Sequence, residues 1–389
     1  MPDHGELALQ SCADALGLGA VAWPGDPGPA FLAAALLKLG SDRQRDRAVS
    51  ALERWLHGLR EVRGTALFGG LTGYVAGLAV AAEAHEPLRP LLSRLSGRLA
   101  DFGAGRPWRA TDVTFADYDL AVGPSGSLLA LRAAGAGMER LGPYVDHLSA
   151  LCLSPGLASL RVTGYPADSA LGWCHGRVNT SLAHGVSGIA VALASVGTAP
   201  GSPHPVGPAL ERAQGFLLSQ LVDDSTGLPT WPRAGRLPGE PRPCPDDLRQ
   251  SWCYGSPGVA WSLWETARVT GDAEAESSAL RVFAAFCDRF DEEIYLLGPS
   301  LGDDLGICHG AAGLCAIADA FWRHARLPQA RALRDRLLPG LARRLPELLG
   351  PAATEPAATL LNGAAGPALV LLTAADLIPR RWLTCIGLR

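Results

Sequence analysis

The sequence predicts an all-α protein, an α/α toroid with six inner and six outer helices. A Gly-x-x-Gly unit followed by an apolar run recurs six times along the 389 residues. The stretches between these units carry apolar residues at the spacing of an amphipathic helix. No long stretch shows the alternation of period two that marks a half-buried strand. Self-similarity of this kind indicates an array or a closed ring of similar elements.

The glycine pairs are the strongest part of this pattern. Successive first glycines lie 53, 62, 70, 55 and 53 residues apart, and each pair opens a nearly uncharged run such as GLTGYVAGL or GAAGPALVL. The six pairs are Gly70/Gly73, Gly123/Gly126, Gly185/Gly188, Gly255/Gly258, Gly310/Gly313 and Gly363/Gly366. Because glycine has no Cβ, a helix that begins with such a pair can lie close to its neighbours at a crowded centre.

An amphipathic helix is predicted between successive glycine units. In residues 42–59 four apolar side chains recur at helical spacing while charged side chains take the other positions. The same pattern recurs in residues 333–345, where Pro339 predicts a kink or break. An amphipathic helix can cover one side of a domain, whereas an uncharged helix must be enclosed. Six such pairs can close into a ring that encloses the uncharged helices and places the amphipathic helices outside. An open solenoid is the structural alternative.

We expect one domain over residues 1–389. The longest interval between glycine units contains a Pro-rich stretch, residues 229–247. We interpret it as a loop of this domain near the mouth of the ring. A solvent loop without function is the other interpretation.

Composition excludes several classes of protein. Apolar residues make up 48 % and charged residues 19 %, so the chain can bury a core and is not globally disordered. The net charge of −4 argues against a strongly basic nucleic-acid binder. Lys38 is the only lysine, which we attribute to genome composition. Two uncharged stretches, residues 64–82 and 356–375, are interrupted by glycines, so we expect buried helices and no membrane span.

The location is expected to be cytoplasmic. Nine cysteines in a chain of this length are too few and too scattered for a disulfide scaffold. The first ten residues, MPDHGELALQ, lack the basic and apolar regions of a signal peptide. In a reducing compartment, clustered Cys and His more often indicate a metal or catalysis than disulfides.

Residues able to do chemistry stand directly before several glycine units. Asp119 lies four residues before Gly123, and His184 immediately precedes Gly185. The pairs Cys253-Tyr254 and Cys308-His309 immediately precede the fourth and fifth units. If the repeats are equivalent, these side chains lie at similar depth around one axis, so they gather at one end of the ring.

Two thiols and one imidazole, from Cys253, Cys308 and His309, form a donor set that suits Zn(II). Three protein ligands would leave a fourth tetrahedral position open, as in catalytic zinc sites. From spacing alone, a metal site and buried hydrophobic cysteines are both open. Cys174-His175 lacks the second glycine of the unit, and we interpret it as a loop. Five further cysteines are expected to be small buried hydrophobes: Cys12, Cys152, Cys287, Cys315 and Cys385.

The motifs SWCYGSPG, ICHGAAG, LAHGVSG and YDLAVGPSG together resemble the lanthipeptide (lantibiotic) cyclases, the stand-alone enzymes that close thioether rings in class I lanthipeptides. The resemblance covers nearly the whole chain and implies an α/α toroid of twelve helices. It implies that Cys253, Cys308 and His309 bind one Zn²⁺ per chain. It also implies a reaction centre lined by four residues: Asp119, His184, Arg249 and Tyr254.

The reaction implied is addition of a Cys thiol to dehydroalanine or dehydrobutyrine in a dehydrated precursor peptide. His184 is the favoured general acid, because imidazole titrates near neutral pH. Asp119 either accepts the thiol proton or orients His184, and Arg249 stabilises either the developing enolate oxygen or the peptide carbonyl. Structural alternatives are a helix cap for Asp119, packing for Tyr254, and charge neutralisation for Arg249.

The implied partners are a dehydratase that acts first and an exporter complex at the membrane. No long dehydratase half is expected in this chain. Two other functions compete with a cyclase. One is a cyclase-like protein that binds zinc, a thiol or a peptide without closing rings. The other is a sugar-active enzyme on an α/α toroid, although such enzymes use paired carboxylates and the motif positions offer one Asp.

Overall fold

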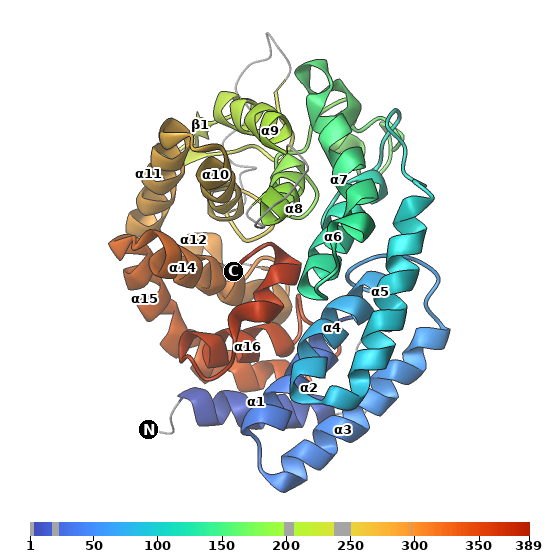
Figure 1. Ribbon diagram of the computed structural model, residues 1–389. Coiled ribbons are helices and arrows are strands. Elements are labelled where there is room, and N and C mark those ends of the chain that lie inside the picture. Colours follow the sequence, from blue (N-terminus) through green and yellow to red (C-terminus); the bar gives the residue numbers. More distant parts are fainter. Residues whose placement is uncertain (1–3, 18–22, 198–205, 237–249, 297) are drawn as a thin grey trace. The chain divides into compact units, whose positions relative to one another are not determined.

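The computed structural model describes residues 4–17, 23–197, 206–236, 250–296 and 298–389 (Figure 1). The chain divides into two compact units. Unit 1 comprises residues 1–99, 133–135 and 291–389, and unit 2 comprises residues 100–132 and 136–290. Each unit is built almost entirely from helices, so the prediction of an all-α chain holds for the described residues.

Unit 1 contains helices from both ends of the chain. They are α1 (His4–Gly17), α2 (Gly28–Leu39), α3 (Asp42–His57), α4 (Leu71–Ala84), α12 (Glu292–Tyr295), α13 (Leu301–Leu305), α14 (Ala311–Ala325), α15 (Pro328–Arg344) and α16 (Ala365–Ala374). Short 3-10 helices are η1 (Gly58–Arg60), η2 (Glu86–Leu88), η7 (Leu345–Leu349) and η8 (Arg380–Ile386). Helix α2 packs on α3, α14 on α15, and α16 on α1. The apolar helices also follow one another in space, because α14 contacts α16, α16 contacts α2, and α2 contacts α4.

Unit 2 repeats this pairing along one continuous part of the chain. Its helices are α6 (Pro124–Ala133, whose last residue is assigned to unit 1), α7 (Met138–Leu153), α8 (Val186–Gly197), α9 (Gly207–Ser219), α10 (Ser256–Thr270) and α11 (Ala273–Arg289). The 3-10 helices are η3 (Phe115–Asp117), η4 (Pro155–Leu160) and η5 (Gly172–Cys174). Helix α8 packs on α9 and α10, and α10 packs on α11. Helix α5 (Arg89–Ala104) begins in unit 1 and ends in unit 2.

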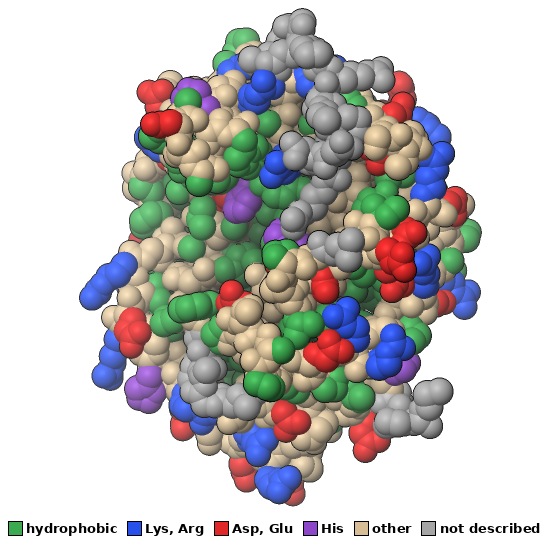
Figure 2. All heavy atoms as spheres, turned by 180° about the vertical axis from the view of Figure 1, so that it is seen from behind, with side chains coloured by type: hydrophobic (Ala, Val, Ile, Leu, Met, Phe, Trp, Pro, Cys, Tyr) green, Lys and Arg blue, Asp and Glu red, His purple; other side chains and the backbone are tan. Residues whose placement is uncertain are grey.

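The helices fall into the two predicted kinds. In α8, which starts at a glycine unit, ten of the twelve residues are buried. In α3 only four of sixteen are buried, and they follow helical spacing at Ala48, Ala51, Leu52 and Trp55. Arg side chains and Asp or Glu side chains are interspersed over the face drawn in Figure 2, in line with the small net charge. None of the described helices is long and apolar enough to cross a membrane.

The structure adds a seventh glycine unit that the repeat count missed. Gly25 and Gly28 precede α2, which is buried along most of its length and packs on the amphipathic helix α3. Gly25 has a φ of +86°, and a Cβ at this position would lie 2.5 Å from the backbone nitrogen of Gly70. Among the described residues there are therefore seven Gly-x-x-Gly units, and the expectation of six is an undercount. This unit, PGDPG, contains two Pro-Gly pairs, which are typical of turns.

Part of the Pro-rich stretch 229–247 belongs to ordered structure. Residues Pro229–Thr230 form strand β2, which pairs antiparallel with β1 (Val222–Asp223), so that Thr230 lies opposite Val222. Trp231 is buried, and its indole N–H donates to the Leu217 carbonyl at 2.7 Å. Residues 237–247 lie outside the described residues. The loop as a whole and the single domain over residues 1–389 stay predictions.

Candidate metal centre and reaction site

Asp119 is held in the turn that leads into α6. Its side chain is 0 % exposed, and its Oδ1 accepts backbone N–H groups from Val122 at 2.7 Å and from Gly123 at 2.8 Å. The Asp119 backbone N–H donates to the Phe115 carbonyl at 2.9 Å, which ties Asp119 to the start of the 3-10 helix η3. Asp119 therefore organises the backbone before the helix, as a cap would, with only one of its oxygens.

The second oxygen of Asp119 contacts His184. His184 Nδ1 and Asp119 Oδ2 are 2.5 Å apart, and the imidazole is 32 % exposed. The Phe115 ring stacks on the imidazole with the ring centroids 4.9 Å apart and the planes 20° apart. Because the carboxylate fixes the proton on Nδ1, Nε2 is the nitrogen left for other chemistry. Among the described residues, Nε2 has no hydrogen-bond partner.

Asp119 and His184 shift each other's pKa. Burial disfavours a charged imidazole, but the hydrogen bond and the charge of Asp119 outweigh it and raise the pKa of His184. Burial raises the pKa of Asp119, while the His184 imidazole and the amides of Val122 and Gly123 lower it in part. An imidazole whose pKa lies above its ordinary value is more fully protonated at neutral pH, which suits a general acid.

Cys253 lies in a turn that is hydrogen-bonded to the loop carrying His184. Cys253 is 1 % exposed, and its carbonyl accepts the N–H groups of Leu182 at 3.0 Å and Ala183 at 3.5 Å. Its Sγ is 3.2 Å from the Ser251 hydroxyl. Gly255, two residues after Cys253, has a φ of +81°, a conformation that favours glycine. These contacts bring Cys253 and the His184–Asp119 pair, predicted separately, into one region of unit 2.

Tyr254 is half-buried beside the same loop. Its hydroxyl is hydrogen-bonded to the side chains of Asn179 and Ser181, and burial, together with the nearby Cys253 thiol, raises its pKa. The Tyr254 ring packs edge-on against Trp173 with centroids 6.2 Å apart. The Arg233 guanidinium lies over the Trp173 ring, 4.9 Å from its centroid. This aromatic group borders the region of Cys253, and the sequence had not indicated Asn179, Ser181 or Arg233.

His309 has a carboxylate partner of its own in unit 1. Its Nδ1 is 2.7 Å from Asp303 Oδ1, and the other oxygen of Asp303 accepts the Ser300 hydroxyl at 2.8 Å. Ser300 and Asp303 belong to the start of the short helix α13, which brings Asp303 back beside a residue six positions later. Since Asp303 contacts Nδ1, Nε2 is the nitrogen of His309 that is left for a metal, as is common for histidine ligands.

The backbone before α14 is held by the glycine unit that precedes α16. The N–H groups of Ile307 and Cys308 donate to the Leu361 carbonyl at 2.7 and 3.3 Å. A Cβ on Gly306 would lie 2.4 Å from that same carbonyl oxygen. Neighbouring units of the repeat therefore position Cys308 and His309 through direct backbone contacts that need glycine.

The three predicted ligands form a candidate metal group. The donor atoms of Cys253, Cys308 and His309 all lie within 4.8 Å of one another. Two sulfurs and one imidazole nitrogen suit Zn²⁺, and three protein ligands leave one tetrahedral position for another ligand. The Asp303 carboxylate behind His309 is the partner that such a ligand requires. The residues present therefore fit a zinc ion.

The remaining candidates from the sequence are Arg249, the Cys174-His175 pair and five further cysteines. Arg249 lies outside the described residues. Cys174 is buried, with its thiol 2.9 Å from the Leu171 carbonyl, and His175 Nδ1 contacts the Tyr165 carbonyl at 2.8 Å. Neither joins the metal group. Four cysteines expected to be small hydrophobes are buried, namely Cys12, Cys152, Cys315 and Cys385, whereas Cys287 is partly exposed.

Comparison with known proteins places this chain in a family. The profile of the family described as "Lanthionine synthetase C-like protein" matches residues 23–386, and the chain belongs to that family. Among solved structures, one described as "Nisin cyclase" is similar with a TM-score of 0.79 and 19 % sequence identity. The match covers 98 % of this chain and 97 % of that one. It confirms the predicted α/α-toroid fold. No curated protein sequence matches the chain.

Proposed function

We propose that the protein is a zinc-dependent lanthipeptide cyclase. It would catalyse the intramolecular addition of Cys thiols to dehydroalanine or dehydrobutyrine in a dehydrated precursor peptide, forming lanthionine or methyllanthionine rings. The group formed by Cys253, Cys308 and His309 carries this proposal. The His184–Asp119 pair, held to the Cys253 turn by backbone hydrogen bonds, and membership of the lanthionine synthetase C-like family support it.

Cys253, Cys308 and His309 would hold the zinc ion. When bound, zinc supplies a position at which a substrate thiol is deprotonated at neutral pH, well below its ordinary pKa near 8.5. On the protein side, Asp303 keeps the proton of His309 on Nδ1 and leaves Nε2 as the ligand atom. Burial of Cys253 keeps bulk water away from one side of the group.

His184 supplies the proton that completes the addition. As the sulfur–carbon bond forms at the β-carbon, the electrons of the double bond move toward the carbonyl oxygen and form an enolate. Nε2 of the protonated His184 then donates its proton to the α-carbon, and the imidazole regains one from solvent. The proton lost by the thiol balances the proton gained by carbon. General acid catalysis of this kind contributes about 10²–10⁴-fold.

Asp119 orients His184 in this proposal. Its side chain is fully buried, and both oxygens are occupied, one by the imidazole and the other by two backbone amides. A carboxylate in this position has no free oxygen with which to accept a thiol proton. Tyr254 lines the region, and Arg249 stays a prediction as the group that stabilises the enolate oxygen.

The partners remain proposals. The substrate requires a dehydratase that acts before this protein, and an exporter complex would bring the protein to the membrane surface without a membrane span. We propose a cytoplasmic location, because the scattered cysteines indicate a reducing compartment.

The proposal is tested with a dehydrated precursor peptide and alkylation of free thiols. Ring closure leaves the peptide mass unchanged, so protection of thiols from alkylation is the readout. We expect the intact protein to protect the thiols and to contain one zinc ion. Cys253→Ala should lose both properties, and Cys152→Ala, which changes a buried cysteine outside the metal group, should keep them.

The same experiment separates the competing functions. If zinc is present and no dehydrated peptide is ever protected, the protein binds without closing rings. If Cys253→Ala retains zinc in full, the metal assignment is wrong. A sugar-active enzyme would require two carboxylates facing a cleft, whereas Asp119 is fully buried.

A further inference from the structure

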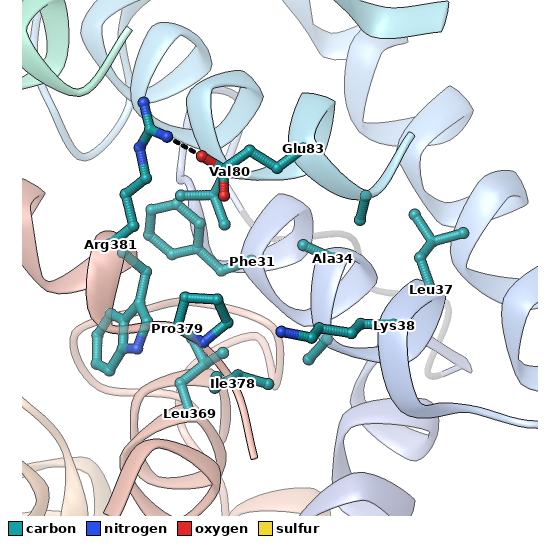
Figure 3. A pocket seen from close by; sticks show the side chains of 13 residues that line it. Phe31, Ala34, Leu37, Lys38, Val80, Glu83, Leu369, Ile378, Pro379 and Arg381 are labelled. Atoms are coloured by element: carbon teal, nitrogen blue, oxygen red, sulfur yellow. Dashed lines mark hydrogen bonds and ion pairs between the residues drawn. The ribbon is translucent and has the colours of Figure 1, made fainter. Parts of the chain in front are cut away.

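A cavity of about 370 Å³ lies in unit 1, and none of the residues that line it is a glycine. It is lined by α2 from Phe31 to Lys38, by the last part of α4, by α16, and by the segment that follows α16 (Figure 3). The residues that matter here are Phe31, Lys38, Val80, Glu83, Arg381 and Trp382. The residues that line the cavity do not include the turn that carries Cys308 and His309, so the two sites are separate.

The walls of the cavity are apolar and fixed. Phe31 and Trp382 are each 1 % exposed, and their ring centroids lie 6.2 Å apart. The Trp382 indole N–H donates to the Thr373 hydroxyl at 2.9 Å, which holds the ring in place. Leu369 and Ile378 complete the apolar lining. A preformed apolar cavity of several hundred Å³ is typical of sites for small organic ligands.

The charges around the cavity do not cancel. Glu83 forms an ion pair with Arg381, and Arg381 also donates to the Ala133 carbonyl at 2.6 Å. Those two charges therefore neutralise each other. Lys38, the only lysine of the chain, extends from α2 toward Pro379 (Figure 3). Among the described residues its ammonium has no hydrogen bond or ion pair. Lys38 is exposed, so a positive charge without an ion pair stands at the rim of an apolar cavity.

We propose that this cavity binds an apolar group that ends in a carboxylate. The apolar part would lie against Phe31 and Trp382, and the carboxylate would pair with the Lys38 ammonium. A cation in the last turn of a helix is also favoured by the helix dipole, but the dipole does not account for a hollow beside it. This binding goes beyond the proposed ring closure and does not depend on the metal group.

The first experiment measures binding of octanoate to the full-length protein by calorimetry, with 1-octanol and octylammonium as probes of equal chain length. We expect saturable binding of octanoate, weaker binding of octanol by about tenfold or more, and no binding of octylammonium. A hydrogen bond to a charged group contributes a difference of this size. Equal affinity for octanoate and octanol, or no saturable binding of octanoate, would overturn the proposal.

Variants then assign the binding to this cavity. Lys38→Met keeps the alkyl stem and should reduce octanoate affinity about tenfold while leaving octanol unchanged. Lys38→Arg should retain affinity. Arg343→Met is the matched control, because Arg343 is an exposed basic residue in the last turn of α15 outside the cavity. Unchanged octanoate affinity in Lys38→Met would contradict the assignment.

A cavity-filling variant keeps the test independent of charge. Val80→Trp should abolish binding of both octanoate and octanol, with folding checked by its melting temperature. Retained octanoate binding in a folded Val80→Trp protein would place the site elsewhere and overturn the proposal. Cys308→Ala, which should lose zinc, should bind octanoate normally, so failure of this proposal and failure of the proposed function can be told apart.

Two sources share this ligand chemistry, a free carboxylic acid and the carboxyl end of a peptide with apolar last residues. An acetylated peptide ending in Leu-Leu, compared with its C-terminal amide, distinguishes them. If the free peptide acid binds more tightly than octanoate and the amide does not bind, the ligand is a chain end. If octanoate binds and both peptides fail, the ligand is a free carboxylic acid.

Discussion

Two histidines of this protein have the same kind of partner in different surroundings. His184 and His309 each place Nδ1 against an aspartate oxygen, at 2.5 and 2.7 Å. The side chain of Asp119 is 0 % exposed and that of Asp303 is 18 % exposed. The second oxygen of Asp119 takes two backbone amides, whereas that of Asp303 takes the Ser300 hydroxyl.

His184 and His309 differ in the side chains that surround them. His309 directly follows Cys308 and belongs to the group of potential metal ligands, whereas His184 stacks on Phe115 and does not. An aspartate on Nδ1 therefore prepares an imidazole for either metal binding or proton transfer, and the neighbouring side chains decide which. Each prediction below removes one member of these two pairs.

The largest effect is expected for His309→Ala. Loss of one of three ligands should abolish stoichiometric zinc and lower ring closure by about 10³-fold or more, since metal activation supplies several kcal/mol. Metal analysis and thiol alkylation measure the two effects. His175→Ala is the matched control, because Cys174-His175-Gly176 has the letters of Cys308-His309-Gly310 and lies outside the metal group. Full zinc content in His309→Ala would show that this histidine is not a ligand.

His184→Ala should separate the two histidines. We expect full zinc content and a ring-closure rate lower by about 10²–10⁴-fold, because the ligands remain and the general acid is lost. The assay is thiol protection followed over time, with zinc measured on the same sample. A rate equal to that of the unchanged protein would contradict the acid role, and loss of zinc would place His184 among the metal ligands.

Asp303→Asn tests the partner of His309. An amide can donate a hydrogen bond to Nδ1, which would put the imidazole proton on Nε2 and oppose metal binding. We expect zinc affinity to fall by about 10–100-fold, measured by competition with a chelator. Asp335→Asn changes a surface aspartate that forms ion pairs with Arg331 and Arg334, and it serves as the control. Unchanged affinity would show that Asp303 does not position the ligand.

Of these substitutions, Asp119→Asn should have the smallest effect on the ring-closure rate at low pH. It should also change how that rate depends on pH. Asp119 raises the pKa of His184, so the imidazole keeps its proton to higher pH in the unchanged protein. Without the carboxylate charge the pKa of His184 falls. As pH rises, the ring-closure rate should therefore decline at a lower pH than in the unchanged protein. Zinc content should stay constant. A profile that keeps the same basic limb would contradict the positioning role of Asp119.

The raised pKa of His184 also makes the stability of the fold depend on pH. A histidine whose pKa is raised on folding stabilises the protein below its unfolded pKa, and this contribution is lost as pH rises through the folded pKa. The unfolding free energy of Asp119→Asn should therefore depend less on pH on the alkaline side of the ordinary histidine pKa. Urea unfolding at several pH values measures this dependence.

Much of the fold could be predicted because its signals are local. The apolar period and the glycine pairs depend only on neighbouring residues, so six of the seven described units were found. The seventh, Gly25/Gly28, was not predicted; its Pro-Gly pairs are typical of turns, and its close contact with Gly70 is visible only in the tertiary structure. The motif positions likewise indicated Cys253, Cys308 and His309 as candidate metal ligands.

The sequence by itself determined which residue types stand before each helix and therefore which chemistry the protein can perform. The tertiary structure decided what each of those residues does. Asp303 was not foreseen because its role depends on the turn of α13, and the burial of Asp119 depends on chain segments far from it in sequence. The sequence attributes Lys38 to composition, whereas the tertiary structure places it beside an apolar cavity. Hydrogen-bond direction and desolvation depend on atoms that only folding brings together, so local patterns cannot predict them.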